Sequence, residues 1–174
     1  LSRYLGSHVR VVSGLQDKIA LYLYQYQGAN SFINMTEIKK FTETDFEFQE
    51  VTRLFNLVSH DDQEHVDDMK EGWAVRDKSL KRDRILIFDD ETVLGFLGYA
   101  QGRNENHQNC YFNIYLDPQY NGQGYRQLLY NRMLEYIQAF DCNRLYSNIY
   151  EHPNYDQYKE FLINNKFSIG LIIR

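Results

Sequence analysis

The stretch Leu116-Asp117-Pro118-Gln119-Tyr120-Asn121-Gly122-Gln123-Gly124-Tyr125-Arg126-Gln127-Leu128-Leu129 decides the fold of this 174-residue chain. It joins an apolar, strand-like run that begins at Cys110 to an amphipathic segment, through a turn with two glycines. Beyond the turn, apolar residues recur at helical spacing and predict one buried face: Leu128, Leu129, Met133, Tyr136, Ile137 and Phe140. Glycines leave the backbone uncovered, so the free amides of the first helical turn can point at an anion. The stretch therefore predicts a phosphate-binding turn.

Two better-known phosphate motifs do not fit these residues. A P-loop needs Lys and then Ser or Thr after its last glycine, whereas Tyr125 and Arg126 follow Gly124. A Rossmann fingerprint needs three glycines, and only two are present here. The six residues from Gln119 to Gly124 match instead the acetyl-coenzyme A signature of the GNAT superfamily of N-acetyltransferases, which is Gln or Arg, two residues, Gly, one residue, Gly or Ala. The chain resembles this superfamily, and most of all the single domains of tandem, mycothiol synthase-like acetyltransferases.

The resemblance extends over about Met35 to Ile173, with elements in the family's order. We expect a strand at Met35 to Phe41, helices at Asp45 to Val58 and about Asp62 to Lys81, a hairpin at Arg84 to Ala100, the signature strand and helix, a strand at Arg144 to Tyr150, a helix at Tyr155 to Asn165, and a strand from Phe167. Thr44 and Glu47 form a capping box that should start the first helix. The resemblance implies an α/β (α+β) fold with a mixed, mostly antiparallel central sheet flanked by helices.

Residues 1–34 lie outside the resemblance and predict an N-terminal β-hairpin extension, with residues 35–174 as the acetyltransferase domain. His8 to Val12 and Ile19 to Gln27 both have strand character. The family usually ends with two strands after its fourth helix, whereas this chain has one. Either the hairpin pairs into this sheet or into that of a neighbouring subunit, which would suit a homodimer, or it packs elsewhere.

Composition limits the classes of partner and the cellular location that we expect for this chain. With 19 basic and 24 acidic residues, the chain offers no broad cationic surface, so we do not expect nucleic acid as a partner. No apolar run reaches the length of about 18 residues that a membrane span needs. His60 and His65 are spaced by five and do not share a helical face, so no metal site is expected. Cys110 and Cys142 are read as reduced, buried thiols of a cytoplasmic protein.

The resemblance also implies a cosubstrate and the residues that hold it. Acetyl-CoA would place its pyrophosphate on backbone amides of the turn: Asn121, Gly122, Gln123, Gly124, Tyr125 and Arg126. The Arg126 side chain would add a charge-assisted contact to phosphate. The edge of the strand Ile114, Tyr115 and Leu116 would pair with the pantetheine arm, which would leave the thioester where this strand diverges from the next.

The catalytic residues depart from the family's pattern. Many members have a Tyr near the end of the fourth helix that protonates the departing thiolate, and Leu162 occupies that position here, with Lys166 at the usual Gly. Tyr158, one turn earlier, is the candidate acid, or else a core aromatic. Glu151 is the candidate base, or else a solvated loop carboxylate. Two functions follow: an N-acetyltransferase acting on a primary amine of a small molecule or peptide, or a weakly active or inactive acetyl-CoA-binding or dimerisation domain.

Overall fold

A computed structural model describes residues 8–14, 36–59, 63–103, 108–140, 142–150 and 156–173 of the chain. One seven-stranded sheet runs through these residues in the order β2-β3-β4-β5-β6-β1-β7. Its strands are β1 (His8–Gly14), β2 (Thr36–Lys40), β3 (Arg82–Asp89), β4 (Thr92–Gln101), β5 (Asn109–Leu116), β6 (Arg144–Tyr150) and β7 (Ser168–Ile173). Only β5 and β6 pair in parallel, and the other neighbours are antiparallel. The predicted mixed, mostly antiparallel sheet is confirmed.

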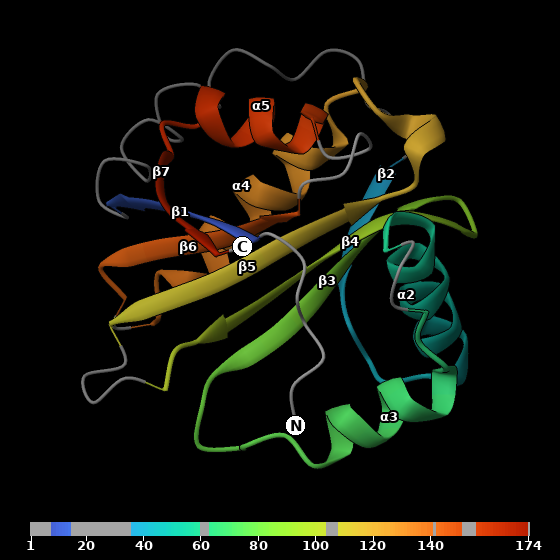
Figure 1. The fold of residues 1–174 in the computed structure, drawn as a ribbon. Coiled ribbons are helices and arrows are strands. Elements are labelled where there is room, and N and C mark those ends of the chain that lie inside the picture. The colour runs from blue at the N-terminus through green and yellow to red at the C-terminus, as the bar shows by residue number, and fades with distance from the viewer. Residues whose placement is uncertain are drawn as a thin grey trace.

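Helices cover both faces of this sheet (Figure 1). They are α2 (Asp45–Val58), α3 (Val66–Ala74), α4 (Tyr125–Ile137) and α5 (Asp156–Asn164). Alternation along β5 assigns the faces, because successive side chains of a strand point to opposite sides. Tyr115 meets Phe55 of α2, with ring centroids 5.5 Å apart, whereas Phe112 meets Tyr130 of α4 at the same distance. The helices α2 and α3 thus lie on one face, and α4 and α5 lie on the other.

The first helix begins where its capping residues predict. The Thr44 hydroxyl accepts the Glu47 amide at 3.2 Å, and Glu47 Oε2 accepts the Thr44 amide at 3.2 Å. The same Glu47 oxygen also accepts the amide and the hydroxyl of Thr42, at 2.8 and 2.9 Å. These bonds explain how a carboxylate can be buried at this helix start, since a buried charge needs hydrogen-bond partners. The capping box and the bounds of α2 are confirmed.

The second helix is shorter than the sequence predicts. It ends at Ala74, where the expectation placed its end near Lys81. The reason is the side chain of Asp77, whose Oδ1 accepts both the amide of Ser79 at 2.9 Å and its hydroxyl at 2.6 Å. An aspartate that bonds the backbone two residues on favours a turn over a helix.

The amino-terminal strand fills the interior of the sheet. β1 pairs antiparallel with β6 along His8 to Gly14 and also with β7, where His8 lies opposite Ile173. The first strand of the predicted hairpin therefore belongs to the sheet of this same chain. The predicted second strand, Ile19 to Gln27, lies outside the described residues.

The two cysteines form a disulfide, and the prediction of reduced thiols is wrong. Cys110 begins β5, Cys142 precedes β6, and their Cα atoms are 5.9 Å apart. The parallel pairing of β5 with β6 produces this proximity, because it sets Cys110 opposite Leu145 at the start of both strands. A spacing of 32 residues gives no sign of this in the sequence.

Candidate functional site

The turn between β5 and α4 has the backbone that only glycine adopts at low cost. This signature turn, residues 117–124, contains a 3-10 helix at Pro118–Tyr120 and ends at Gly124, the residue that precedes α4. Gly122 and Gly124 have φ values of 78° and 86°, in the left-handed region where a Cβ atom is strained. A Cβ built on either residue would have no heavy atom within 4 Å. The turn is therefore open at both glycines, with room above the backbone for a ligand.

The amides around these glycines are free to bind an anion. Within the described part of the chain, the N–H groups of Gly122, Gln123, Gly124, Tyr125 and Arg126 donate to no other residue. Asn121 differs, because its amide already donates to the carbonyl of Pro118 at 3.2 Å. The amides lie at the N-terminal end of α4, where the helix dipole favours negative charge.

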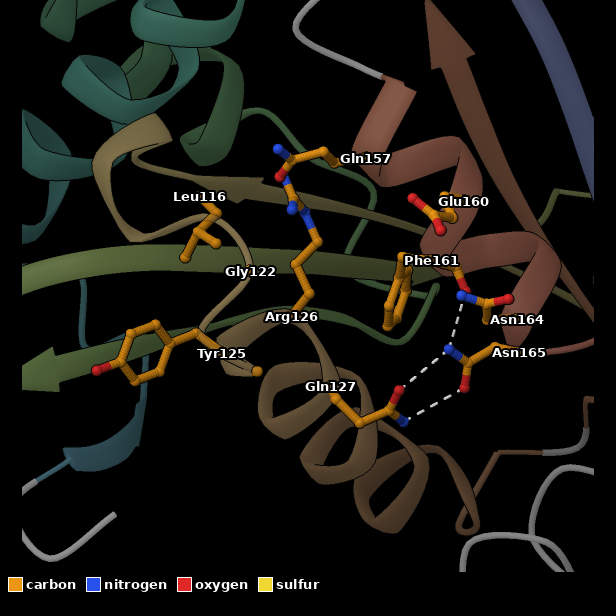
Figure 2. Close-up of a pocket in the computed structure, with 11 residues that line it drawn as sticks. Leu116, Gly122, Tyr125, Arg126, Gln127, Gln157, Glu160, Phe161, Asn164 and Asn165 are labelled. Atoms are coloured by element: carbon orange, nitrogen blue, oxygen red, sulfur yellow. Dashed lines mark hydrogen bonds between the residues drawn. The ribbon is translucent and has the colours of Figure 1, made fainter. Parts of the chain in front are cut away.

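A cavity of about 360 Å³ opens beside this turn, between α4 and α5 (Figure 2). We call it the α4–α5 cavity; its lining residues include Leu116, Gly122, Gly124, Arg126, Glu160 and Phe161. Arg126 extends from the start of α4 toward Gln157 of α5. Its buried Nε atom has no hydrogen-bond partner among the described residues, and burial lowers the pKa of the guanidinium. An anion in the cavity would give this cation the partner it lacks.

Two side-chain amides hold the helices together on either side of this cavity. Gln127 in the first turn of α4 donates to Asn165 Oδ1 at 3.3 Å, and Asn165 donates back to Gln127 Oε1 at 3.1 Å. Asn165 also donates to the carbonyl of Phe161 at 2.9 Å. These bonds fix the end of α5 against the start of α4, so the cavity walls are pre-organised.

The sheet divides beside the same cavity. β5 and β6 pair only from Asn109 with Arg144 to Phe112 with Ser147, and beyond this point they separate. We call this opening the fork; its sides are residues 113–116 of β5 and 148–150 of β6. The residues 113–116 still pair with β4 on their other edge. Among the described strands, none pairs with Ile114 and Leu116 on the side toward β6, where a ligand could pair like a strand.

A chain of polar side chains closes the narrow end of the fork. Asn113 Oδ1 accepts the amide of Asn148 at 3.1 Å and the hydroxyl of Ser147 at 3.3 Å. The Asn148 amide can only donate, so it fixes the Asn113 oxygen toward β6. Ser147 Oγ lies 2.5 Å from the hydroxyl of Tyr158 on α5. Since Ser147 donates to Asn113, Tyr158 is the donor in the second bond.

The predicted catalytic residues are only partly described by the structure. Tyr158 is buried and stacks on Phe161, with ring centroids 6.1 Å apart. Leu162 is fully buried in the core and has no group that could move a proton. Lys166 occupies the position where the family usually has Gly, and its φ of 62° keeps the backbone conformation that Gly would adopt. Glu151 lies outside the described residues.

A second cavity, of about 340 Å³, lies on the opposite face of the sheet, under α2 and α3. We call it the α2–α3 cavity; its walls include Phe55, Glu64, Trp73, Arg84, Tyr111 and Tyr115. Asn113 also lines it, so the polar chain at the fork connects this cavity with Tyr158 on the other face.

Sequence reasoning missed several of these residues. Asn113 and Ser147 matter because of where two strands separate, which no local pattern reveals. Arg53 of α2 binds Asp117 at 3.0 Å and the carbonyl of Val93 at 2.9 Å, and it thereby ties the start of the signature turn to α2. Only the run of apolar and aromatic residues in β5 indicated that its side chains would line a cleft.

Similar proteins agree with this geometry. The model of the acetyltransferase (GNAT) family matches residues 43–160. A protein of unknown function from Staphylococcus epidermidis shares 7% identity over 96% of this chain and 59% of its own, with a TM-score of 0.64. A tandem GNAT protein from the clavulanic acid biosynthesis pathway shares 10% identity over 96% of this chain and 51% of its own, with a TM-score of 0.66.

An aminoglycoside acetyltransferase from an uncultured soil sample, in complex with sisomicin, shares 14% identity over 76% of this chain and 88% of its own, with a TM-score of 0.62. No curated protein sequence matches the chain. The chain spans about half to three fifths of the first two structures. Because the family model covers more than half of its residues, and its signature turn has the backbone described above, this chain belongs to the GNAT family of acetyltransferases.

Proposed function

We propose that this chain transfers the acetyl group of acetyl-CoA to a primary amine of a small molecule or peptide. The observation that carries the proposal is the signature turn, where five amides without described partners surround two glycines with open space above them. The pyrophosphate would bind the amides of residues 122–126 and the Arg126 guanidinium. The pantetheine would enter the fork along the edge of Ile114, Tyr115 and Leu116.

The reaction needs a neutral amine. At pH 7, deprotonating a lysine-like amine costs about 4 to 5 kcal/mol, whereas an α-amine costs only about 1 kcal/mol. The amine nitrogen then forms a bond to the thioester carbon, the carbon–sulfur bond breaks, and the proton that the amine loses balances the proton that the thiolate gains. We propose Glu151 for the first proton transfer. Tyr158 would supply the second, the proton that the thiolate gains; its hydroxyl is bonded to Ser147 at the narrow end of the fork.

The turn can be tested by a residue that keeps its backbone but fills its space. Asn adopts positive φ more readily than other non-glycine residues. We therefore expect Gly122→Asn to preserve the thermal midpoint of unfolding and to weaken acetyl-CoA binding by at least about tenfold, measured by titration calorimetry. Arg132→Met, on the exposed side of α4, is the matched control and should bind normally. Equal affinity in Gly122→Asn and the unaltered chain would contradict the proposal.

A second candidate function is an acetyl-CoA-binding or dimerisation domain without chemistry of its own. It is favoured by Leu162, which is fully buried where many relatives carry a Tyr, and by a tandem neighbour of which this chain spans 51%. Thiol release measured across a panel of amines separates the two. Acetyl-CoA binding without thiol release from any amine would favour the binding domain.

A further inference from the structure

Three arginines gather around the indole of Trp73, and two of them, Arg82 and Arg84, line the α2–α3 cavity. The guanidinium carbons of Arg76, Arg84 and Arg82 lie 4.3, 4.5 and 5.1 Å from the centroid of Trp73. Arg76 is neutralised by Glu43, with a nitrogen–oxygen distance of 2.8 Å. Burial and the charge of Arg82 lower the pKa of Arg84 to about 10. Like charges this close repel one another, so the cluster is costly unless an anion joins it.

Arg82 is exposed to solvent, whereas Arg84 has a buried nitrogen without a partner among the described residues. In the part of the chain that the structure describes, its buried Nη1 atom makes no hydrogen bond, and its Nη2 atom reaches the sulfur of Met69, at 3.1 Å. Thioether sulfur is a weak acceptor. Among the described residues, no carboxylate forms an ion pair with Arg84. A guanidinium with free donors in a cavity is shaped to bind a carboxylate.

The carboxylates that line the same cavity do not fill this role. Asp83 precedes Arg84 on β3, so strand alternation directs its side chain to the opposite face. Consistently, the pKa of Tyr99 is raised first by burial and then by the charges of Asp83 and of Tyr136 on α4. Glu64 precedes α3, and its backbone is held by Asn56 through two hydrogen bonds of 2.8 and 2.9 Å. Of the two carboxylates that line the cavity, Glu64 is the one not directed to the opposite face, and it is the one that would attract the ammonium group of a ligand.

The remaining walls of the cavity are aromatic. Phe96 stacks on Tyr115 with ring centroids 4.6 Å apart, and Phe55 packs against Tyr115 at 5.5 Å. A cavity of about 340 Å³ is at the small end of the range for small-molecule sites. It suits a compact ligand with an apolar body.

We propose that the acetyl acceptor is an amine that also carries a carboxylate and an apolar side chain, and that Arg84 binds this carboxylate. This proposal rests on the function proposed above. Asn113 lines the cavity at the fork, so a ligand held by Arg84 would lie on the side from which an amine can approach the thioester. Amines with several positive charges would be repelled by Arg82 and Arg84, which separates this chain from its aminoglycoside-acetylating neighbour.

The unaltered chain gives the first test. Thiol release would be measured with acetyl-CoA and four matched amines: phenylalanine, its carboxamide, its phosphonate analogue and phenethylamine. Hydrogen bonds to charged groups contribute about 1.5 to 3 kcal/mol, so kcat/KM for phenylalanine should exceed that for the carboxamide and for phenethylamine by about ten- to a hundredfold. Equal values for the acid and the carboxamide, or a preference for the phosphonate, would overturn the carboxylate assignment.

Variants of Arg84 give the second test. Arg84→Met keeps an unbranched side chain beside Phe41 and Trp73 but removes the charge. It should raise KM for phenylalanine at least about tenfold, reduce the ratio of kcat/KM between acid and carboxamide to about one, and leave acetyl-CoA affinity unchanged. The thermal midpoint should stay equal or rise, because an unpaired cation is removed; a structural arginine would lower it. Arg132→Met should keep the preference for the acid.

The outcomes distinguish the two proposals. No acetyl-CoA binding would overturn the proposed function, whereas thiol release without preference for the acid would overturn only the carboxylate inference. If acetyl-CoA binds without turnover, calorimetry with phenylalanine and with its carboxamide tests the carboxylate inference. Phenylalanine should bind to the unaltered chain and not to Arg84→Met, and the carboxamide should bind to neither. If Arg84→Met fails to fold, the comparison of amines with the unaltered chain still decides.

Discussion

Lys166 shows how a single residue can keep a family's backbone without its usual side chain. It follows α5 with a φ of 62°, and the helix end around it closes through the Lys166 amide to Ile163 and the Phe167 amide to Leu162, at 2.9 and 3.0 Å. This pattern of bonds is that of a helix end where Gly is normally preferred. The residue therefore stores strain that a glycine would release.

We expect Lys166→Gly to stabilise the protein by about 1 kcal/mol, because a left-handed backbone costs an L-residue about 1 to 2 kcal/mol and glycine loses part of this gain to chain entropy. Urea denaturation measures the change. Lys159→Gly, inside the same helix and exposed, is the matched control and should cost about 1 kcal/mol. A loss of stability in Lys166→Gly would contradict this account of the helix end.

In our proposal, Tyr158 supplies the proton that the departing thiolate gains. Tyr158→Phe keeps the ring on Phe161 but removes the proton donated to Ser147. We expect kcat to fall by about a hundredfold or more, which is the usual contribution of a general acid, with acetyl-CoA affinity unchanged. Steady-state thiol release gives kcat, and calorimetry gives the affinity. Tyr136→Phe on α4 is the control, and equal kcat in the two variants would remove Tyr158 from the mechanism.

At the scale of elements, the approach of β4 to β5 just before the signature turn depends on Gly95. A Cβ atom at Gly95 would lie 2.7 Å from the Tyr115 carbonyl oxygen and 2.8 Å from Leu116 Cδ1. Both contacts are too short for real atoms, so one strand would have to move. Leu116 leads directly into the turn, and the movement would displace the start of the site.

We expect Gly95→Ala to lower the free energy of unfolding by about 1 to 3 kcal/mol, the usual cost of overpacking a core. Gly98→Ala in the same strand is the matched control, because its Cβ would meet nothing closer than Arg84 Cγ at 3.9 Å. It should change stability by less than about 0.5 kcal/mol. Urea denaturation of both variants checks the difference, and equal effects would show that close strand approach is not the cause.

The elements that the sequence predicts well are those with local signals. The bounds of α2 follow from Thr44 and Glu47, and the signature turn follows from the spacing of Gly122 and Gly124. The end of α3 was predicted too late because the Asp77 side chain competes with the helix, and periodicity does not register that competition. No local pattern indicated a function for Arg84. Its surroundings are formed by Trp73 and Met69, which are more than ten residues away in the sequence.

At the scale of the whole molecule, the sheet has two parts that meet only at the short pairing of β5 with β6. The disulfide of Cys110 with Cys142 lies at this junction, at the end opposite the fork. Parallel pairing over a few residues is weak, so the covalent link fixes the base from which the fork opens. Pairing of β1 into this sheet was one of the two alternatives that the sequence left open, but neither its place between β6 and β7 nor the disulfide could be predicted, because both arise from contacts between distant segments.

We expect reduction of this disulfide to lower the free energy of unfolding by about 3 to 4 kcal/mol, from the entropy of a closed loop with a separation of 32 residues. Denaturation curves with and without a phosphine reductant measure this. The Cys110→Ala/Cys142→Ala double variant is the control, and its curve should not respond to reductant. Titration of two free thiols in the denatured, unreduced protein would contradict the disulfide.

The position of β1 has a consequence for how the protein is made. β1 precedes the other described strands in the chain, and both strands that flank it, β6 and β7, follow more than a hundred residues later. At translation speeds of about 5 to 20 residues per second, this strand waits on the order of ten seconds or more for its neighbours to leave the ribosome. During that interval its backbone is available to chaperones or to other nascent chains, and this part of the sheet forms only after β6 and β7 have been synthesised.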